Sequence, residues 1–439
     1  MLSVHFKVPT KIIILGLLAI SIRLILMPIS MHPDLFFINM FPNLFYSQKV
    51  LEIFSFINDN FQNSRLSYYT PLTYYTFVLF QYPYHLISNS FSTWMTDLYQ
   101  FYINRTQIAY TKDYLGQITN AFLFRDLFLA KIPYLLFEAG SLILLFKFVK
   151  SKYLKPTTII AWLFAPIIIY STYMYGQYDI IPAFFVLLGF YLLRKNPYIS
   201  LIAFGVAAAF KNYAILFVLI VSIIYGKSVK EKLKMLIVGL LPYLISLFPV
   251  LISDAKLSIY SLFPKPYFQT SESLLGWPLV SRYLHLIVLG ISLFFTFSMA
   301  AIVKTKDKWQ TTLSASLVAI TLVITLAPLV VFHYLLWAFP LAVLWLRKAK
   351  TVYLFTTFQT LFAASFMLLA NRVQLGLFAP LNNEYFSSIP TFNQIIDKVI
   401  PYSIFSTLGY FAFIFINLAL CVVVLNNLLF KSSLNRSLK

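Results

Sequence analysis

Cysteine and charged residues are both scarce in this chain of 439 residues. The single cysteine, Cys421, lies inside an apolar run, so neither a disulfide framework nor a cysteine-based metal site is predicted. Only 11% of the residues are charged, whereas a soluble domain has about 25%. With 60% hydrophobic residues and a mean hydropathy of +0.79, the chain is too apolar for a soluble fold. These values predict an integral membrane protein whose solvent is the bilayer.

Acidic residues are the rarer charge, with 14 Asp and Glu against 34 Lys and Arg and a net charge of +20. A nucleic-acid partner is not predicted, because the basic residues fall in short clusters between apolar runs rather than on one polar domain. We interpret these clusters as marks of membrane topology, since cytoplasmic loops carry an excess of Lys and Arg.

Processing and domain signals are missing as well. Lys7 and Lys11 precede the first apolar stretch, as in a signal peptide, but no small-residue cleavage site follows, so we expect a retained first span. No repeat of 20 to 50 residues, no soluble domain and no low-complexity linker interrupts the chain. A single transmembrane domain over residues 1–439 is predicted.

Apolar runs of roughly 17 to 25 residues predict the membrane segments. Two shorter runs count as spans because they end in basic clusters, and residues 197–226 are predicted to form a hairpin of two short or broken helices with Lys211 near the turn. The expected segments are 11–29, 126–148, 156–174, 179–193, 199–210, 213–225, 233–252, 283–303, 311–328, 330–346, 352–370 and 402–430. We therefore predict an all-α polytopic protein with about twelve segments, within a range of eleven to thirteen.

The charges select one orientation for these segments. If odd-numbered spans run outward, the seven cytoplasmic pieces hold 21 of the 34 basic residues but only two acids, Glu231 and Asp307. Eleven of the other acids fall outside and Glu138 lies within a span. Both ends of the chain are then cytoplasmic. Residues 30–125 form a long external loop, residues 126–350 the remaining core spans and residues 351–439 the C-terminal spans.

The long external loop is too long for a passive connector, so we expect it to fold on the membrane. Between Val50 and Phe61 the apolar residues share one helical face, which is typical of a helix lying in the interface. Tyr74–Ile87 is a second apolar stretch that fits either a span or a juxtamembrane helix, and we prefer the juxtamembrane helix because the polar segment after it has nearly balanced charge.

Two candidate site residues lie in this loop. Asp34 follows the first span, where Pro33 stiffens the exit and holds the carboxylate close to the membrane surface; a merely solvated acid is the alternative. Tyr69 precedes Pro71 at the start of an aromatic helix, and an interfacial aromatic belt would account for it equally well.

Later candidates lie at the predicted outer ends of spans. Gln177 and Asp179 follow Gly176, a residue that permits a tight turn, although Asp179 could simply cap the next helix. Lys211 is an ionisable residue in apolar sequence, which is costly and therefore suggests function over snorkelling. His333 lies at the end of a span pair, where a lone histidine is more often structural.

The order of these residues resembles the membrane glycosyltransferases of the GT-C superfamily, which transfer a sugar from a polyprenyl-phosphate carrier and include dolichol-phosphate-mannose-dependent mannosyltransferases and their bacterial relatives. The resemblance spans most of residues 11–350. Its first elements are an acid early in a long first loop, here Asp34, and a Tyr-Pro-Pro-Leu-like segment, here Tyr69–Leu72 with Thr70 in place of one proline. A Gly-Gln-x-Asp segment follows at Gly176–Asp179. The last two elements are a small-residue helix ending in Lys, here Gly205–Lys211, and a late His-Tyr, here His333–Tyr334.

The resemblance implies an inverting transfer of mannose or a similar hexose or pentose to a lipid-linked, glycan or protein acceptor on the non-cytoplasmic face. Asp34 would be the catalytic base, and the carrier phosphate would be bound by Lys211, His333 and Tyr69. Gln177 and Asp179 would orient sugar hydroxyls.

No cofactor is firmly predicted from these residues. Many superfamily members carry two neighbouring acids in the first loop, whereas Asp34 stands alone until Glu52. A divalent metal ion stays open but lacks that paired-acid support.

Other classes remain as alternatives. A transporter or flippase for a lipid-linked or anionic solute would also use Lys211 and a broken helix, but no inverted or parallel repeat is visible. Ligases and polymerases that use lipid-linked sugars place their large loop late in the chain, and a non-catalytic scaffold is the third alternative. The composition favours a bacterial plasma membrane, while the lone external sequon Asn104-Arg105-Thr106 is weak evidence for the endoplasmic reticulum.

Overall fold

The computed structural model describes residues 10–47, 53, 69–87, 89–103, 115–116, 120–151, 153–252, 279–302, 307–326, 331–367 and 376–437. Within these ranges all regular structure is helical and no strand occurs, as the sequence predicts. Helices suit an apolar solvent because each one satisfies its own backbone hydrogen bonds. Five helical stretches in the described ranges are long and apolar enough to cross a membrane: Thr10–Ile29, Leu123–Lys150, Thr157–Met174, Lys308–Leu326 and Tyr402–Leu429.

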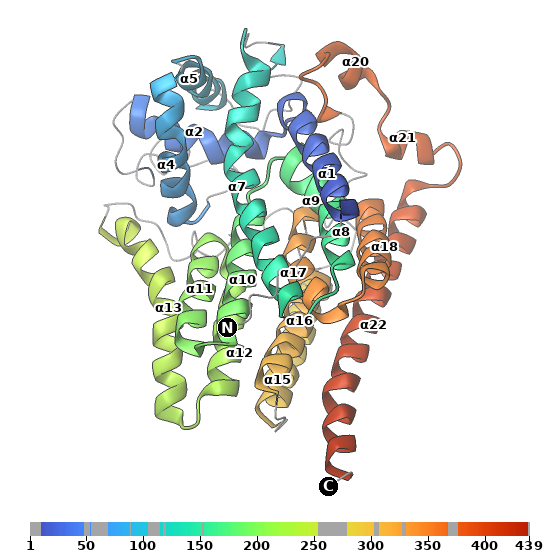
Figure 1. Cartoon of the computed structure of the whole chain (residues 1–439). Coiled ribbons are helices and arrows are strands. Elements are labelled where there is room, and N and C mark those ends of the chain that lie inside the picture. The colour runs from blue at the N-terminus through green and yellow to red at the C-terminus, as the bar shows by residue number, and fades with distance from the viewer. Residues whose placement is uncertain are drawn as a thin grey trace.

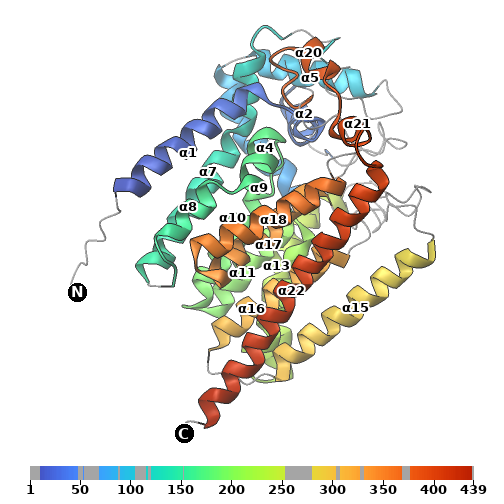
Figure 2. The same ribbon diagram turned by 90° about the vertical axis from the view of Figure 1, so that its right-hand side faces the viewer.

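The long helices occur where apolar runs predict them, with ends that differ by a few residues. They are α1 (Thr10–Ile29), α7 (Leu123–Lys150), α10 (Ile180–Leu193), α13 (Val229–Ile252), α15 (Leu279–Ile302), α16 (Lys308–Leu326), α17 (Leu335–Leu346), α18 (Ala349–Met367) and α22 (Tyr402–Ser437). Helix α1 runs toward the end of the molecule that carries the smaller helices, and α22 runs away from it (Figure 2).

The predicted span 156–174 is not one continuous α-helix. It consists of α8 (Thr157–Leu163), the short α9 (Pro166–Ile168) and η1 (Ile169–Met174), which is a π-helix. The break falls at Ala165, whose extended backbone (ψ 118°) is the conformation that a following proline favours. Single π-turns often occur at functional sites, and η1 ends directly before the Tyr175–Asp179 segment.

The predicted hairpin is present as two short helices, α11 (Pro197–Phe210) and α12 (Ile215–Tyr225). The chain is extended at Lys211 (φ −148°, ψ 120°), and a 3-10 turn, η2 (Asn212–Ala214), leads into α12. Asn196 starts α11 by accepting hydrogen bonds from the backbone N–H groups of Tyr198 and Ile199. Lys211 therefore lies at the helix break, as predicted.

Three helices of the predicted external loop gather at one end of the bundle (Figure 1). They are α2 (Pro33–Ser47), α4 (Pro71–Ile87) and α5 (Asn89–Ile103). Helix α2 starts only four residues after α1 and places Asp34 in its first turn, which the sequence analysis did not predict. The interfacial helix expected over residues 50–61 lies outside the described residues except for Ile53, and the sequon at 104–106 lies outside them entirely.

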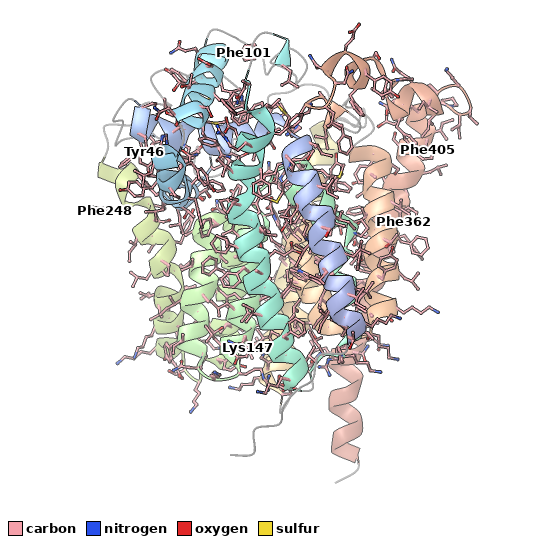
Figure 3. The ribbon with its side chains drawn as sticks, turned by 45° about the horizontal axis from the view of Figure 1, so that its top comes forward. Tyr46, Phe101, Lys147, Phe248, Phe362 and Phe405 are labelled. Carbon is pink, nitrogen blue, oxygen red and sulfur yellow. The ribbon has the colours of Figure 1, made fainter. Side chains whose placement is uncertain are left out.

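Two short helices of the C-terminal part, α20 (Asn383–Ser388) and α21 (Phe392–Ile396), lie near the same end (Figures 1 and 2). Lys147 lies at the opposite end from Phe101 (Figure 3).

Helices α10, α16 and α17 form the centre of the bundle, and nearly every residue of α16 and α17 is buried. The outer helices α1, α13, α15 and α22 expose large apolar side chains. A helix that is apolar all round belongs inside a large protein, whereas an exposed apolar face needs lipid. The packing therefore agrees with a membrane protein whose polar groups are gathered inside.

Candidate active site

Asp34 contacts Gln177 across 143 residues of sequence. The amide Nε2 of Gln177 donates a hydrogen bond to Asp34 Oδ2, and it lies 3.5 Å from the hydroxyl oxygen of Tyr69. The Asp34 side chain keeps 24% of its surface exposed, whereas Gln177 is 1% exposed. Asp34 is therefore held by a contact within the protein while part of its carboxylate stays exposed, rather than being a merely solvated acid.

Asp179 is the centre of a second polar group. Its Oδ1 accepts a hydrogen bond of 2.6 Å from Trp337 Nε1 and lies 3.4 Å from Lys211 Nζ. Its Oδ2 lies 3.9 Å from His333 Nε2 and has no hydrogen-bond partner among the described residues. Asp179 occupies the cap position of α10, yet its side chain makes no capping hydrogen bond. The carboxylate is thus used for contacts across the bundle and not for starting its own helix.

Aromatic rings join the two polar groups. The ammonium of Lys211 lies over four rings, at 4.8 Å from the Tyr178 centroid, 5.5 Å from Tyr334, 5.8 Å from Trp337 and 6.0 Å from Tyr69. Such contacts stabilise a cation that is largely removed from water. Tyr69 also lies beside Gln177, so Gln177 and Tyr69 connect Asp34 to Lys211 through side-chain contacts. The fold therefore brings all six predicted site residues together.

Local backbone conformations explain why these side chains converge. The π-helix η1 closes with a hydrogen bond of 2.8 Å from Tyr175 N–H to Tyr170 O, and Gln177 N–H then bonds Ser171 O at 2.8 Å. Gly176 has φ +87°, a conformation that glycine adopts readily. The π-helix and the glycine turn together point Gln177 toward Asp34 and Asp179 toward α17.

Burial keeps Tyr69 in its protonated form. Removal from water raises the pKa of the Tyr69 hydroxyl well above its ordinary value, and the nearby charge of Asp34 raises it further. Tyr69 is only 9% exposed, so an open interfacial belt does not describe its position. Its hydroxyl is available as a hydrogen-bond donor at neutral pH.

The sequence analysis missed two residues of the site. Trp337 belongs to the Leu-Leu-Trp sequence after His333, but its contact with Asp179 spans 158 residues. His32 precedes Asp34 by two residues, and its ring stacks on Tyr175 with the centroids 3.6 Å apart. The only sign of His32 in the sequence was its position two residues before Asp34. A lone histidine near an acid is weak evidence for a site.

A metal site is not evident in the described part of the chain. No group of three or more His, Cys, Asp and Glu side chains comes together there in a way that could hold a metal ion. The described neighbours of Asp34 are the imidazole of His32, the amide of Gln177 and the hydroxyl of Tyr175.

The polar site lies among apolar helices and includes a partly exposed carboxylate, and comparison with known proteins supports, in broad terms, a membrane glycosyltransferase of the GT-C type. The sequence model of glycosyltransferase family 87 matches residues 123–274. The matched region contains Gln177, Asp179 and Lys211, whereas Asp34, Tyr69 and His333 lie outside it. The match supports a glycosyltransferase activity. No curated protein matches the chain.

Proposed function

We propose that the chain is an inverting glycosyltransferase that moves a sugar, mannose or a similar hexose or pentose, from a polyprenyl-phosphate carrier to a lipid-linked, glycan or protein acceptor. One observation carries the proposal: the partly exposed carboxylate of Asp34 is joined through Gln177 and Tyr69 to Lys211, a cation with 15% of its side chain exposed. A base on one side and a cation on the other are what a direct displacement of a phosphate requires.

In this reaction Asp34 accepts the proton of the acceptor hydroxyl as its oxygen attacks the anomeric carbon. A new carbon–oxygen bond forms there, the bond from the anomeric carbon to the phosphate oxygen breaks, and its electron pair leaves with the carrier phosphate. Attack from the face opposite the phosphate inverts the anomeric centre. A phosphate is a stable anion, so the leaving group needs electrostatic stabilisation more than a general acid.

The other residues hold the two ends of the donor. Lys211, His333 and the protonated Tyr69 bind the carrier phosphate, where positive charge and donated hydrogen bonds stabilise the developing negative charge. Gln177 Oε1 and Asp179 Oδ2 are buried acceptors without a hydrogen-bond partner among the described residues, which suits them to receive sugar hydroxyls. Asp179 Oδ1 meanwhile holds Lys211 in place.

The same proposal includes the membrane arrangement. About twelve segments place both chain ends in the cytoplasm and the α2, α4 and α5 end on the non-cytoplasmic side, because the basic clusters at 147–155, 194–196 and 227–234 would all lie at the opposite end. The carrier's tail stays in the bilayer while its head reaches Asp34. We favour a bacterial plasma membrane over the endoplasmic reticulum.

The test is a transfer assay with purified protein, labelled polyprenyl-phosphate sugars and crude lipid or glycan acceptors. Asp34→Asn keeps the size and the hydrogen-bond acceptor but removes the base, so the rate should fall by about 10²–10⁴-fold. Asp397→Asn makes the same change at an exposed acid after α21 and should keep the wild-type rate.

Two outcomes would overturn the proposal. Equal rates for wild type and Asp34→Asn would exclude Asp34 as the base. A wild-type protein that transfers no sugar from any donor, yet moves a lipid-linked solute across liposomes, is a transporter or flippase and not a transferase.

A further inference from the structure

His32 lies in the short link between α1 and α2, and its imidazole caps the helix that carries Asp34. Its Nδ1 accepts a hydrogen bond of 3.1 Å from the backbone N–H of Asp34, and its carbonyl oxygen accepts one of 3.0 Å from Leu35 N–H. A ring nitrogen that accepts a hydrogen bond must carry a lone pair. The proton of a neutral His32 is therefore on Nε2.

The surroundings of His32 keep the ring neutral and leave a small part of the side chain exposed. One face of the ring stacks on Tyr175, with an interplanar angle of 24°. Burial lowers the pKa of His32 to about 4, although the charge of Asp34 acts in the opposite direction. The side chain still exposes 14% of its surface, and the hydrogen bond found for its ring among the described residues is made by Nδ1, not by Nε2. The neutral ring thus keeps one N–H donor, on Nε2, and belongs to a side chain that neighbours the Asp34 carboxylate.

Capping alone does not account for an imidazole at this position. Asparagine is among the best capping residues, and its side-chain oxygen can accept the same bond from Asp34 N–H. The amide N–H groups of asparagine, however, do not reach the position that Nε2–H occupies in the longer imidazole side chain. The distinctive property of His32 is therefore its Nε2–H, carried by a ring whose Nδ1 lies 3.5 Å from Asp34 Oδ1.

We propose that His32 contacts substrate directly, and that its Nε2–H donates a hydrogen bond to a hydroxyl oxygen of the acceptor beside the hydroxyl that Asp34 deprotonates. The acceptor is then a sugar or another polyol with neighbouring hydroxyls, not a lone alcohol or a serine side chain. This inference rests on the proposed function, and it deepens that function by naming the acceptor class.

The test uses the full-length protein in detergent, a labelled polyprenyl-phosphate sugar, and n-octyl hexosides with their monodeoxy counterparts as acceptors. For wild type, removal of the hydroxyl next to the accepting one should lower kcat/KM by about tenfold, the cost of one lost hydrogen bond to a desolvated donor. For His32→Asn the two acceptors should differ by less than about twofold, because the amide N–H of asparagine does not reach the position of Nε2.

Two comparisons separate a substrate contact from a structural role. His32→Asn should raise KM for the acceptor while KM for the donor and the melting temperature stay near the wild-type values, since the cap is retained. His32→Gln restores an N–H group near the position of Nε2 and should recover part of the discrimination between hexoside and deoxyhexoside.

Each contrary result has a distinct meaning. If wild type transfers sugar and Asp34→Asn does not, but His32→Asn discriminates as wild type does, His32 only caps α2 and the inference is wrong. A change confined to the donor KM, or a wild type that glycosylates simple alcohols or serine peptides and no hexoside, also overturns it. An inactive wild type would instead count against the proposed function itself.

Discussion

At the scale of single residues, the site depends on a backbone turn whose conformation is unfavourable for any residue with a side chain. Gly176 has φ +87°, and a Cβ built on it would lie 3.0 Å from both Cβ and Cδ1 of Leu35, the residue after Asp34. The carbonyl oxygen of Gly176 accepts a hydrogen bond of 2.7 Å from the hydroxyl of Tyr134. The turn therefore brings the chain before Gln177 into close contact with the start of α2.

Gly176→Ala should damage both stability and transfer. The added methyl group strains a left-handed backbone, at a cost of about 1–2 kcal/mol, and pushes against Leu35, which moves Gln177 relative to Asp34. We expect a lower melting temperature and a transfer rate reduced by more than about tenfold, a loss of about 1.4 kcal/mol of transition-state stabilisation.

Gly16→Ala is the matched control for this change. A Cβ at Gly16 in α1 meets nothing within 4 Å, and alanine favours a helix, so stability should be kept or raised. A wild-type rate in Gly176→Ala would show that the turn does not position Gln177.

At the scale of elements, buried ionic contacts tie α1 to α7 and η1. Arg23 on α1 forms a two-bond pair with Glu138 on α7, with N–O distances of 2.7 and 2.6 Å, and the hydroxyl of Tyr173 on η1 bonds the same carboxylate. Lys131 Nζ adds bonds of 2.5 Å to Ser30 O and 2.8 Å to Tyr173 O. Ser30 lies four positions before Asp34, and Tyr173 lies four positions before Gln177. These contacts therefore fix the start of the two chain segments that carry Asp34 and Gln177.

Breaking one half of the Arg23–Glu138 pair should cost more than removing both halves. Arg23→Met leaves the buried carboxylate of Glu138 without its cation, a loss of about 3–5 kcal/mol, whereas Arg23→Met with Glu138→Leu removes both charges of the pair. Thermal unfolding in detergent should therefore give the lowest melting temperature for the single variant. If the double variant melts lower than Arg23→Met, the pair contributes through packing and not through its charges.

At the scale of the whole molecule, the distribution of basic residues gives a topology that can be tested chemically. Removing the buried Cys421 as Cys421→Ser yields a background without cysteine. In that background, Glu384→Cys on α20 should react with a membrane-impermeant maleimide in intact cells. Lys150→Cys, at the exposed end of α7, should react only after the membrane is opened. The reverse pattern would place the site on the cytoplasmic side.

Much of the fold could be read from local sequence. Apolar runs predicted the long helices, because a hydrocarbon core about 30 Å thick imposes a length that each segment meets by itself. The break at Lys211 was predictable for the same reason, since 30 residues between two basic clusters are too few for two full crossings. The break at Ala165 and the helix that starts at Pro33 were not, because proline stops one helix and starts another according to its neighbours.

The sequence alone determined the class of protein, the approximate positions of its helices and a short set of polar residues for a site, because composition and segment length are local properties of the chain. Only the tertiary structure decided which of those residues meet. The contacts of Gln177 with Asp34, of Asp179 with Trp337 and of Arg23 with Glu138 each join residues more than 100 positions apart. Such pairs depend on how the helices pack, because most buried polar groups that find no partner in their own helix find one in another.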